Sequence, residues 1–258
     1  VKRIAAEVGV TASIGLSYNK SLAKVASDLD KPKGFAVIGR DEAVEFLAAQ
    51  PVSIIWGAGK ALQRRLAKEG ITIVAQLQAI EGSELLARYG AVGQRMAQFV
   101  RGEDPRRVSA NRPTKSISSE TTFHNDIADG KALKKVLWRQ ADRVARRIKN
   151  AELAGTTVVL KLRRADFRIL TRSCRLPDPT QLADTIYHHA AELLAKEING
   201  TAYRLLGVGL SGLVDGAEAD PLSLADPCGG RRADAERALD KVRERFGTEA
   251  IGKGRGLR

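Results

Sequence analysis

Two glycines flank Ala58 directly before a stretch with helical spacing, in the segment IIWGAGKALQRRLAKEGI (residues 54–71). Gly57 and Gly59 let the backbone turn sharply without Cβ clashes. The amides at the start of the following helix can then point together at an oxygen of a phosphate, where the helix dipole also favours negative charge. The chemistry that this segment predicts is therefore anion binding by backbone N–H groups.

The helix after this turn carries Lys60, Arg64 and Arg65, which supply positive charge close to the turn. Such side chains contact the nucleic-acid backbone rather than base edges. The pattern is that of a helix-hairpin-helix element, which binds DNA without reading its sequence. The alternative is an ordinary connection between two helices, in which the glycines serve only compactness.

A second basic segment is YNKSLAKVASDLDKPKG, residues 18–34. Asn19 is a good helix cap, and Lys20 and Lys24 lie on the helix that would follow it. Lys31 comes just beyond the end of that helix, in a turn fixed by proline, where an ammonium group can reach a polyphosphate. For each lysine the alternative is a solvated basic helix face.

A third basic region lies on expected strands. Lys161 and Arg163 alternate with two leucines, so the two cations share one strand face. Arg168 and Arg172 are expected to alternate in the same way on the next strand, and basic side chains on the open face of a sheet suit the phosphates of a duplex. The helix expected at 131–150 also carries many cations, but we interpret these as solvating charges.

Groups that could carry out catalysis are missing. His188 and His189 are adjacent on an expected helix and cannot both face one metal ion, and Cys174 and Cys228 lack C-x-x-C spacing. There is no P-loop, nucleophile elbow or dinucleotide fingerprint, and no set of carboxylates that would converge on two metal ions ~4 Å apart. We predict no catalytic and no metal-ligating residue in this chain.

The composition points to a polyanionic partner. The chain has 258 residues and a formal net charge of +13, and the 131–175 region holds fourteen Lys and Arg against three acidic residues. A surplus of this size attracts phosphate backbones, so nucleic acid is favoured over an anionic membrane surface. Two cysteines are too few for a disulfide framework, which fits a reducing cytoplasm, and no apolar run approaches the length of a membrane span.

The elements that must position these groups indicate an α+β multidomain chain. Residues 1–50 read as a small α/β unit and 51–110 as short helices joined by glycine turns, followed by a basic linker at 106–113. Residues 111–213 follow the order βαββαβ, which predicts a four-stranded sheet covered on one face by two helices. Residues 214–258 read as a tail that ends in a charged helix with little apolar stripe.

Three segments in this order and spacing resemble the Y-family translesion DNA polymerases of the DNA polymerase IV type: TASIGLSYNKSLAKVASDLDKPKG, IIWGAGKALQRRLAKEGI and RVSANRPTKSISSETTF. The resemblance runs from about residue 1 to residue 213. It implies the C-terminal part of a palm at 1–50, a helix-hairpin-helix thumb at 51–110 and a little finger at 111–213.

The resemblance also implies roles for residues. Lys31 would approach the incoming deoxynucleoside triphosphate. The hairpin would grip primer-side phosphates, with a monovalent cation held by its backbone carbonyls. The strand KSISSE would bring Lys115, Ser116 and Ser118 close to the template backbone.

The chain departs from the family at three points. The metal-binding carboxylates and the aromatic sugar gate precede the segment that matches Val1, which also lacks a preceding helix cap, so we expect a truncated palm. The whole protein would be a Mg²⁺-dependent nucleotidyltransferase that extends primers past damaged bases, whereas this chain alone would bind primer-template DNA as a monomer without polymerising.

The other two departures are local. Trp56 stands where family hairpins often have proline. The segment ADPLSLADP (219–227) lacks the aromatic anchor of a sliding-clamp peptide.

Two other functions remain open. A non-catalytic DNA-binding accessory protein derived from the same family would keep the DNA contacts and lack the chemistry. An RNA-binding protein is supported by the charge alone.

Overall fold

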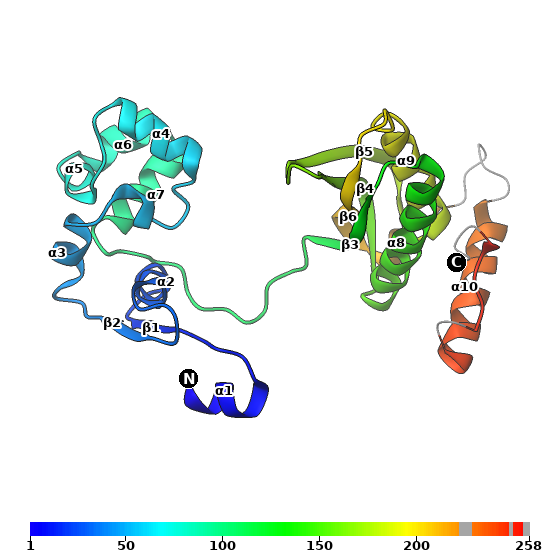
Figure 1. Cartoon of the computed structure of the whole chain (residues 1–258), viewed down its shortest axis with the longest axis horizontal. Coiled ribbons are helices and arrows are strands. Elements are labelled where there is room, and N and C mark those ends of the chain that lie inside the picture. The colour runs from blue at the N-terminus through cyan, green and yellow to red at the C-terminus, as the bar shows by residue number, and fades with distance from the viewer. Residues whose placement is uncertain (222–228, 248–249, 255–258) are drawn as a thin grey trace. The chain divides into compact units, whose positions relative to one another are not determined.

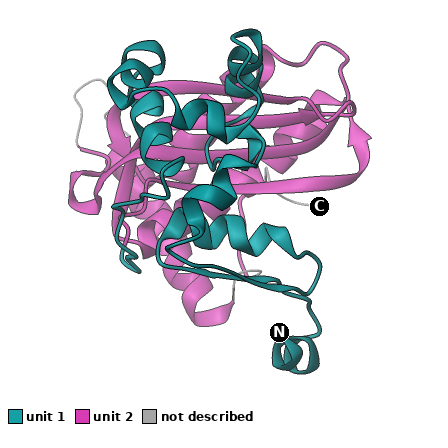
Figure 2. Cartoon of the chain, turned by 90° about the vertical axis from the view of Figure 1, so that its left-hand side faces the viewer, with its two compact units in different colours: residues 1–111 teal, residues 112–258 magenta. Residues whose placement is uncertain are grey.

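A computed structural model describes residues 1–221, 229–247 and 250–254 of the chain. The chain divides into two compact units, residues 1–111 and 112–258 (Figure 2). Residues 100–115, all of which are described, contain no helix or strand. The division therefore falls within the stretch for which the sequence predicts a linker.

The first half of unit 1 contains a two-stranded parallel sheet. Its elements are α1 (Lys2–Val8), β1 (Ile14–Ser17), α2 (Lys20–Leu29), β2 (Phe35–Ile38) and α3 (Ala43–Ala48). The helix α2 connects the two strands (Figure 1). As the sequence predicts, the Asn19 side chain caps α2, because it accepts a hydrogen bond of 3.0 Å from the amide of Leu22. The strand β1 has only four residues.

One face of this small sheet is exposed in the described structure. Ile14 lies opposite Phe35, and Leu16 lies opposite Val37. All four side chains are exposed, three of them by more than half.

The second half of unit 1 is helical. It contains the 3₁₀ turn η1 (Val52–Ile54) and the helices α4 (Lys60–Lys68), α5 (Val74–Gln78), α6 (Gly82–Tyr89) and α7 (Ala91–Phe99). One cluster of buried side chains joins both halves, since it includes Leu22 and Val25 of α2 together with Leu66, Leu77 and Leu85 of the helices. Burial of apolar surface on this scale is the main term that holds the short helices together.

Unit 2 has the element order that the sequence predicts for residues 111–213. It contains β3 (Ser116–Ile127), α8 (Gly130–Asn150), β4 (Leu153–Arg164), β5 (Ile169–Thr180), α9 (Ala183–Ala195) and β6 (Tyr203–Asp215). The strands form one antiparallel sheet in the order β3-β6-β4-β5. Both helices cover the same face of this sheet (Figure 1).

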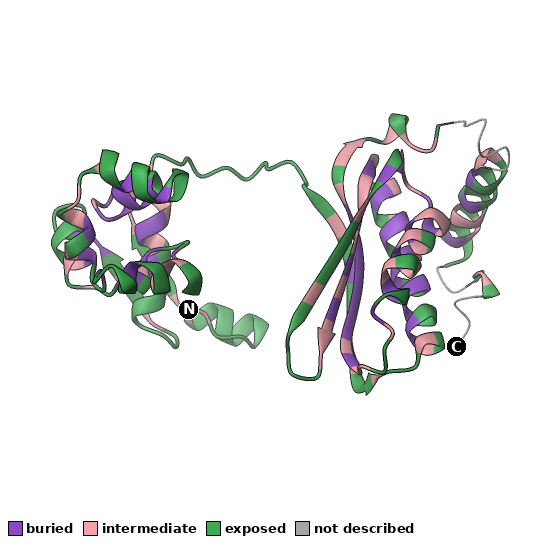
Figure 3. Cartoon of the chain, turned by 90° about the horizontal axis from the view of Figure 1, so that it is seen from above, coloured by how far each residue is buried: buried purple, intermediate pink, exposed green. Residues whose placement is uncertain are grey.

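The core of unit 2 lies between the sheet and these two helices. Leu160 and Leu162 of β4 are buried against Leu137 of α8 and Ile186 of α9. From Val158 to Arg163 of β4, buried residues alternate with partly exposed ones, as the colours along the strands in Figure 3 indicate. One face of the sheet is therefore buried under the helices, and the second face is not. We call this second face the open face.

The register places Arg172 on the helix-covered side of the sheet, so the prediction that it shares the basic face was wrong. Arg172 lies opposite Leu160, and directly opposed residues of an antiparallel pair point to the same face. Its Nε lies 2.7 Å from Oε1 of Glu197, just beyond α9. Arg168 precedes β5, in a turn where it pairs with Asp166 at 3.4 Å.

A last helix, α10 (Gly229–Phe246), is attached to unit 2 mainly by charged groups. Nζ of Lys149 lies 2.6 Å from carboxylate oxygens of both Glu236 and Asp240. The buried Glu236 also accepts hydrogen bonds from the amide of Ala183 at the start of α9. This ionic attachment accounts for the weak apolar stripe of the helix in the sequence.

None of the helices in the described ranges is both long and apolar enough to cross a bilayer.

Candidate nucleic-acid interface

The glycine turn of unit 1 lies on the surface and begins α4. Gly57 has φ +98°, a left-handed conformation that favours glycine. The turn is closed by a hydrogen bond of 2.9 Å from the amide of Ala58 to the carbonyl of Ile55. Gly57 and Gly59 are exposed, while the methyl group of Ala58 is buried in the core of unit 1. All three predicted turn residues can therefore offer a ligand only backbone groups.

The start of α4 is open to an external acceptor. Gly59 is its N-cap and provides no side chain. Within the described part of the chain, no acceptor is found for the amides of Lys60, Ala61 and Leu62. In contrast, carboxylates accept hydrogen bonds from the first turns of α2, α8 and α9. Three unsatisfied amides at the positive end of a helix form a binding geometry for an anion.

Among the described residues, nothing requires glycine at position 59. Its backbone has φ −67°, which any residue adopts, and a Cβ placed there would meet no atom within 4 Å. Conformation and internal packing therefore do not explain this residue. Close approach of an external group to the backbone would explain it.

The cations of α4 have different surroundings. Lys60 and Arg64 are exposed, and Lys60 has no ion-pair partner among the described residues. Arg65 instead lies over the Tyr89 ring, with its Cζ 4.6 Å from the ring centroid, and donates a hydrogen bond to the carbonyl of Arg88. Lys60 and Arg64 are thus available to a ligand, whereas Arg65 is engaged within the unit.

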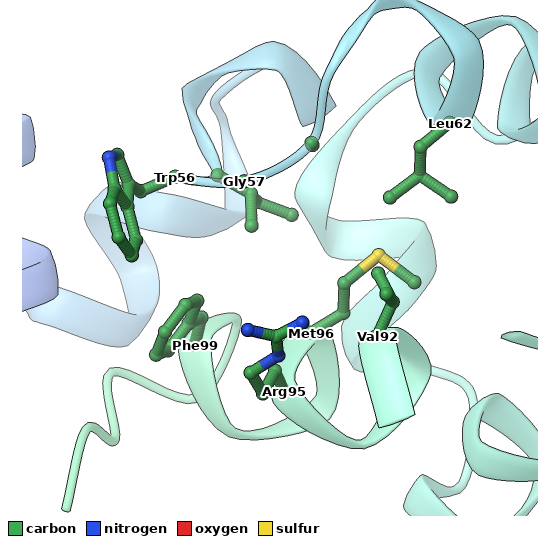
Figure 4. Close-up of a pocket in the computed structure, with 9 residues that line it drawn as sticks. Trp56, Gly57, Leu62, Val92, Arg95, Met96 and Phe99 are labelled. Carbon is green, nitrogen blue, oxygen red and sulfur yellow. The ribbon is translucent and has the colours of Figure 1, made fainter. Parts of the chain in front are cut away.

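Two hollows adjoin the turn. A small apolar cavity of about 50 Å³ lies beneath it, with Met96 and Phe99 of α7 facing the loop that carries Trp56 and Gly57 (Figure 4). An open cleft of about 610 Å³ is lined by residues 56–59 and by Lys24 and other α2 residues. The basic helix and the glycine turn, separate in the sequence, therefore line one cleft.

Lys31 lies at the end of α2, where it is paired with an acidic residue. Its Nζ lies 2.5 Å from Oδ1 of Asp28, and Lys24 donates a hydrogen bond to the other oxygen of that carboxylate. Hydrogen bonds from Lys24 and Lys31 lower the pKa of Asp28. A phosphate at Lys31 would compete with this carboxylate.

The predicted residues of unit 2 share the open face. The register aligns Ser118 with Gly209 and Val159 across three strands, and Ser116 with Ser211 on the same face. Lys161 and Arg163 follow Val159 on this face, and Lys115 is exposed immediately before β3. Ser116, Ser118, Lys161 and Arg163 therefore lie on one surface of the sheet. The alternation with leucines predicts the shared face of Lys161 and Arg163.

The middle of this open face has no side chains on β6. A Cβ on Gly207 would lie 2.7 Å from the Cβ of Glu120, and one on Gly209 would lie 2.7 Å from the Cβ of Ser118. The glycines leave a groove of about 330 Å³, whose floor is backbone and whose walls include Ser118 and Lys161. A backbone floor with hydroxyl and ammonium walls suits a polar polyanion.

Sequence reasoning missed three residues of these two surfaces. Glu120 pairs with Lys161 on the open face, and Arg175 is exposed there opposite Thr157. Arg106 lies over the Trp56 ring beside the glycine turn. Thr157 lies on the same face of β4 as Lys161 and Arg163, so the correct pairing of β4 with β5 would have placed Arg175 there as well. The contacts of Glu120 and Arg106 could not be found in this way, because each joins residues far apart in the sequence.

No group of three or more His, Cys, Asp or Glu side chains within the described ranges could hold a metal ion. The sliding-clamp segment considered at 219–227 lies mostly outside the described residues.

Comparison with known sequences decides the family. The impB/mucB/samB family C-terminal domain matches residues 114–224. DNA polymerase IV of Brucella melitensis is 49% identical over 253 residues, covering 98% of this chain, and DNA polymerase IV 1 of Mesorhizobium japonicum is 50% identical over 248 residues, covering 96%. Over nearly its whole length, the chain is related to DNA polymerase IV proteins. This confirms the resemblance read from the three sequence segments.

The chain spans 57% of the length of each of these two DNA polymerase IV relatives. A solved Y-family DNA polymerase chimera shares the fold, with a TM-score of 0.65 over 83% of this chain and 62% of the chimera, at 23% identity. At this identity the likeness to the chimera concerns the fold alone.

Proposed function

We propose that this chain is the DNA-holding part of a translesion DNA polymerase, which as a whole protein carries out template-directed nucleotidyl transfer past damaged bases. The observation that carries the proposal is the open start of α4, where three amides without an acceptor among the described residues lie beside a glycine that the chain itself does not need. A phosphate of the DNA backbone supplies both the anion and the close approach.

The two units supply different contacts in this proposal. Residues 1–50 and 51–110 act as palm and thumb: Lys31 approaches the triphosphate of the incoming nucleotide, and Gly57, Gly59, Lys60 and Arg64 hold primer-side phosphates. Residues 111–213 act as the little finger, whose open face follows the duplex backbone. A monovalent cation on the hairpin carbonyls belongs to the same proposal, although the carbonyl of Ala58 already accepts a hydrogen bond from Gln63 at 2.5 Å.

The metal chemistry of the whole protein is not assigned to this chain. Mg²⁺ would neutralise charge on the transferred phosphoryl group, and its ligands are not among the described residues. We therefore expect the chain to bind primer-template DNA and to incorporate no nucleotide. A sliding clamp remains a proposed partner of the whole protein.

Salt-dependent binding tests the DNA-holding role. We expect the affinity of the chain for a primer-template duplex to fall steeply as salt rises, because phosphate contacts release counterions. Replacing both Lys60 and Arg64 by Gln should weaken DNA binding. It should also reduce the slope of the logarithm of the binding constant against the logarithm of the salt concentration, by about one for each phosphate that these side chains no longer neutralise. Lys68→Gln, at the far end of the same helix, is the matched control. Equal effects of both changes would contradict the role of the helix start.

A non-catalytic accessory protein is the second candidate, favoured by the absence of a metal-binding carboxylate cluster from the described residues. A primer-extension assay on the product of a reading frame extended upstream of Val1 separates the polymerase from the accessory protein. Mg²⁺-dependent extension by that product would exclude the accessory protein.

A further inference from the structure

Trp56 is an exposed indole that the structure holds in a fixed place. It directly precedes the glycine turn, and 53% of its surface is exposed. Cζ of Arg106 lies 4.9 Å from the centroid of its ring and 5.1 Å from the centroid of the Phe99 ring. One guanidinium thus contacts both aromatic rings, a favourable cation–π arrangement.

Arg106 is itself immobilised. Its Nε and Nη2 donate hydrogen bonds of 2.7 Å to the two oxygens of Asp104. Asp104 has no exposed side-chain surface and also accepts a hydrogen bond of 3.0 Å from the amide of Ser21, at the start of α2. A bidentate pair of this kind fixes the plane of the guanidinium, so the position of Trp56 is set by α2 and α7 as well as by its own loop.

The indole lines both hollows beside the turn. On one side it borders the small cavity with Phe99 and Met96, as Figure 4 shows. It also lines the open cleft of about 610 Å³, together with residues 57–59 and Lys24. The cleft is within the size range of sites for ligands of nucleotide size. It therefore places an aromatic surface directly beside the open amides of α4.

We propose that Trp56 is a stacking platform for one unpaired nucleobase of a DNA strand that enters the open cleft beside the glycine turn. The inference rests on the proposed DNA-holding function and adds a base contact to it. Every base has a flat π face, so stacking on an indole is tolerant of sequence. Because Arg106 and Asp104 fix the ring beforehand, little freedom is lost when a base stacks on it.

Tryptophan fluorescence can observe this contact directly. The chain has two tryptophans, and Trp138 is buried, with 3% of its surface exposed. In a Trp138→Phe chain, Trp56 is the only indole. We expect a short oligodeoxythymidylate to quench its emission at saturation, and an abasic strand with the same number of phosphates to leave the emission nearly unchanged. Equal quenching by both strands would overturn the inference.

Affinity measurements provide the second readout. In the chain with both tryptophans, Trp56→Ala should weaken binding of the oligodeoxythymidylate at least about fivefold, because it removes the aromatic surface on which the base stacks. Trp56→Phe should restore most of this loss, because it returns an aromatic ring to the site. Binding of the abasic strand should not change. Phe167→Ala, which removes another exposed aromatic ring with an arginine over it, is the control.

The two proposals fail in different ways. If the unsubstituted chain binds neither these strands nor a primer-template duplex, the DNA-holding function is wrong. If it binds the duplex and neither single strand, the stacking platform alone is wrong. If it binds both strands and Trp56→Ala leaves the preference for the base-bearing strand intact, the stacking platform alone is wrong.

Discussion

Nζ of Lys161 lies 2.7 Å from Oε2 of Glu120, and the ion pair spans the backbone of Gly207 on the strand between them. The two side chains are partly exposed on the open face. A phosphate that approaches Lys161 must therefore displace this carboxylate. The ion pair holds the ammonium group of Lys161 in position. At the same time, the Glu120 carboxylate competes with a DNA phosphate for that ammonium group.

Glu120→Gln should tighten binding of duplex DNA to the chain by about fivefold at low salt, since it removes a like charge whose repulsion is on the order of 1 kcal/mol. The free energy of unfolding should fall by less than about 1 kcal/mol, because exposed ion pairs contribute little. Glu192→Gln makes the same change of charge on α9 and is the control. Equal tightening by both variants would show that only net charge matters.

Gly59→Ala and Gly57→Ala should separate binding from stability. Gly59→Ala should change the free energy of unfolding by less than about 1 kcal/mol, because its backbone is ordinary and its surroundings are open. It should nevertheless weaken DNA binding. Gly57→Ala should destabilise unit 1 by about 1–2 kcal/mol through its left-handed φ. Thermal unfolding and a DNA titration of both variants measure the two effects. Unchanged DNA binding by Gly59→Ala would remove the argument for close approach of a phosphate.

Asp104 should contribute to the acid sensitivity of unit 1. The Arg106 hydrogen bonds lower the pKa of this carboxyl below its ordinary value of 3.8. A lowered pKa in the folded state stabilises the protein above the unfolded-state pKa, and this stability is lost as the pH falls from about 3.8 through the folded-state pKa. Asp104→Asn should lower the stability of the folded chain at neutral pH, and stability should then depend less on pH below about pH 4. The midpoint of thermal unfolding, measured as a function of pH, follows both effects. Asp41→Asn, in the same unit, is the control. If Asp104→Asn lost stability below about pH 4 as steeply as the unsubstituted chain, the role of the Asp104–Arg106 pair would be contradicted.

Lys149→Ala should release α10. It leaves Glu236 and Asp240 without their shared cation, and a partly buried unpaired carboxylate is costly. Amide hydrogen exchange within Gly229–Phe246 should accelerate at least about tenfold, which corresponds to a loss on the order of 1.4 kcal/mol. Lys131→Ala, an exposed position on α8, should have no such effect. If both variants left α10 equally protected, the ionic attachment would not be what holds the helix.

Patterns within single elements could be read from the sequence. The cap at Asn19 and the alternation of Lys161 and Arg163 with buried leucines follow from local rules, and the structure confirms both. Arg172 was misplaced because Ile169 and Leu170 are adjacent apolar residues, so the strand alone does not say which face is buried. Only its pairing with β4 decides this.

Contacts across the chain could not be read in this way. Glu120 and Lys161 meet because β6 brings β3 and β4 together, and Arg106 reaches Trp56 only after the chain has passed through four helices. Net charge predicts a polyanionic partner. It could not show that several of these cations, including Lys31 and Arg65, are already paired or stacked within the protein.

The exposed face of the β1–β2 sheet has a practical consequence for every titration described above. This face is a contiguous apolar surface formed by Ile14, Leu16, Phe35 and Val37. Burial of such a surface between two molecules releases water and favours their association. We expect the purified chain to be prone to self-association at high concentration and to bind environment-sensitive dyes. Dilute samples and a check of hydrodynamic size belong with each binding curve.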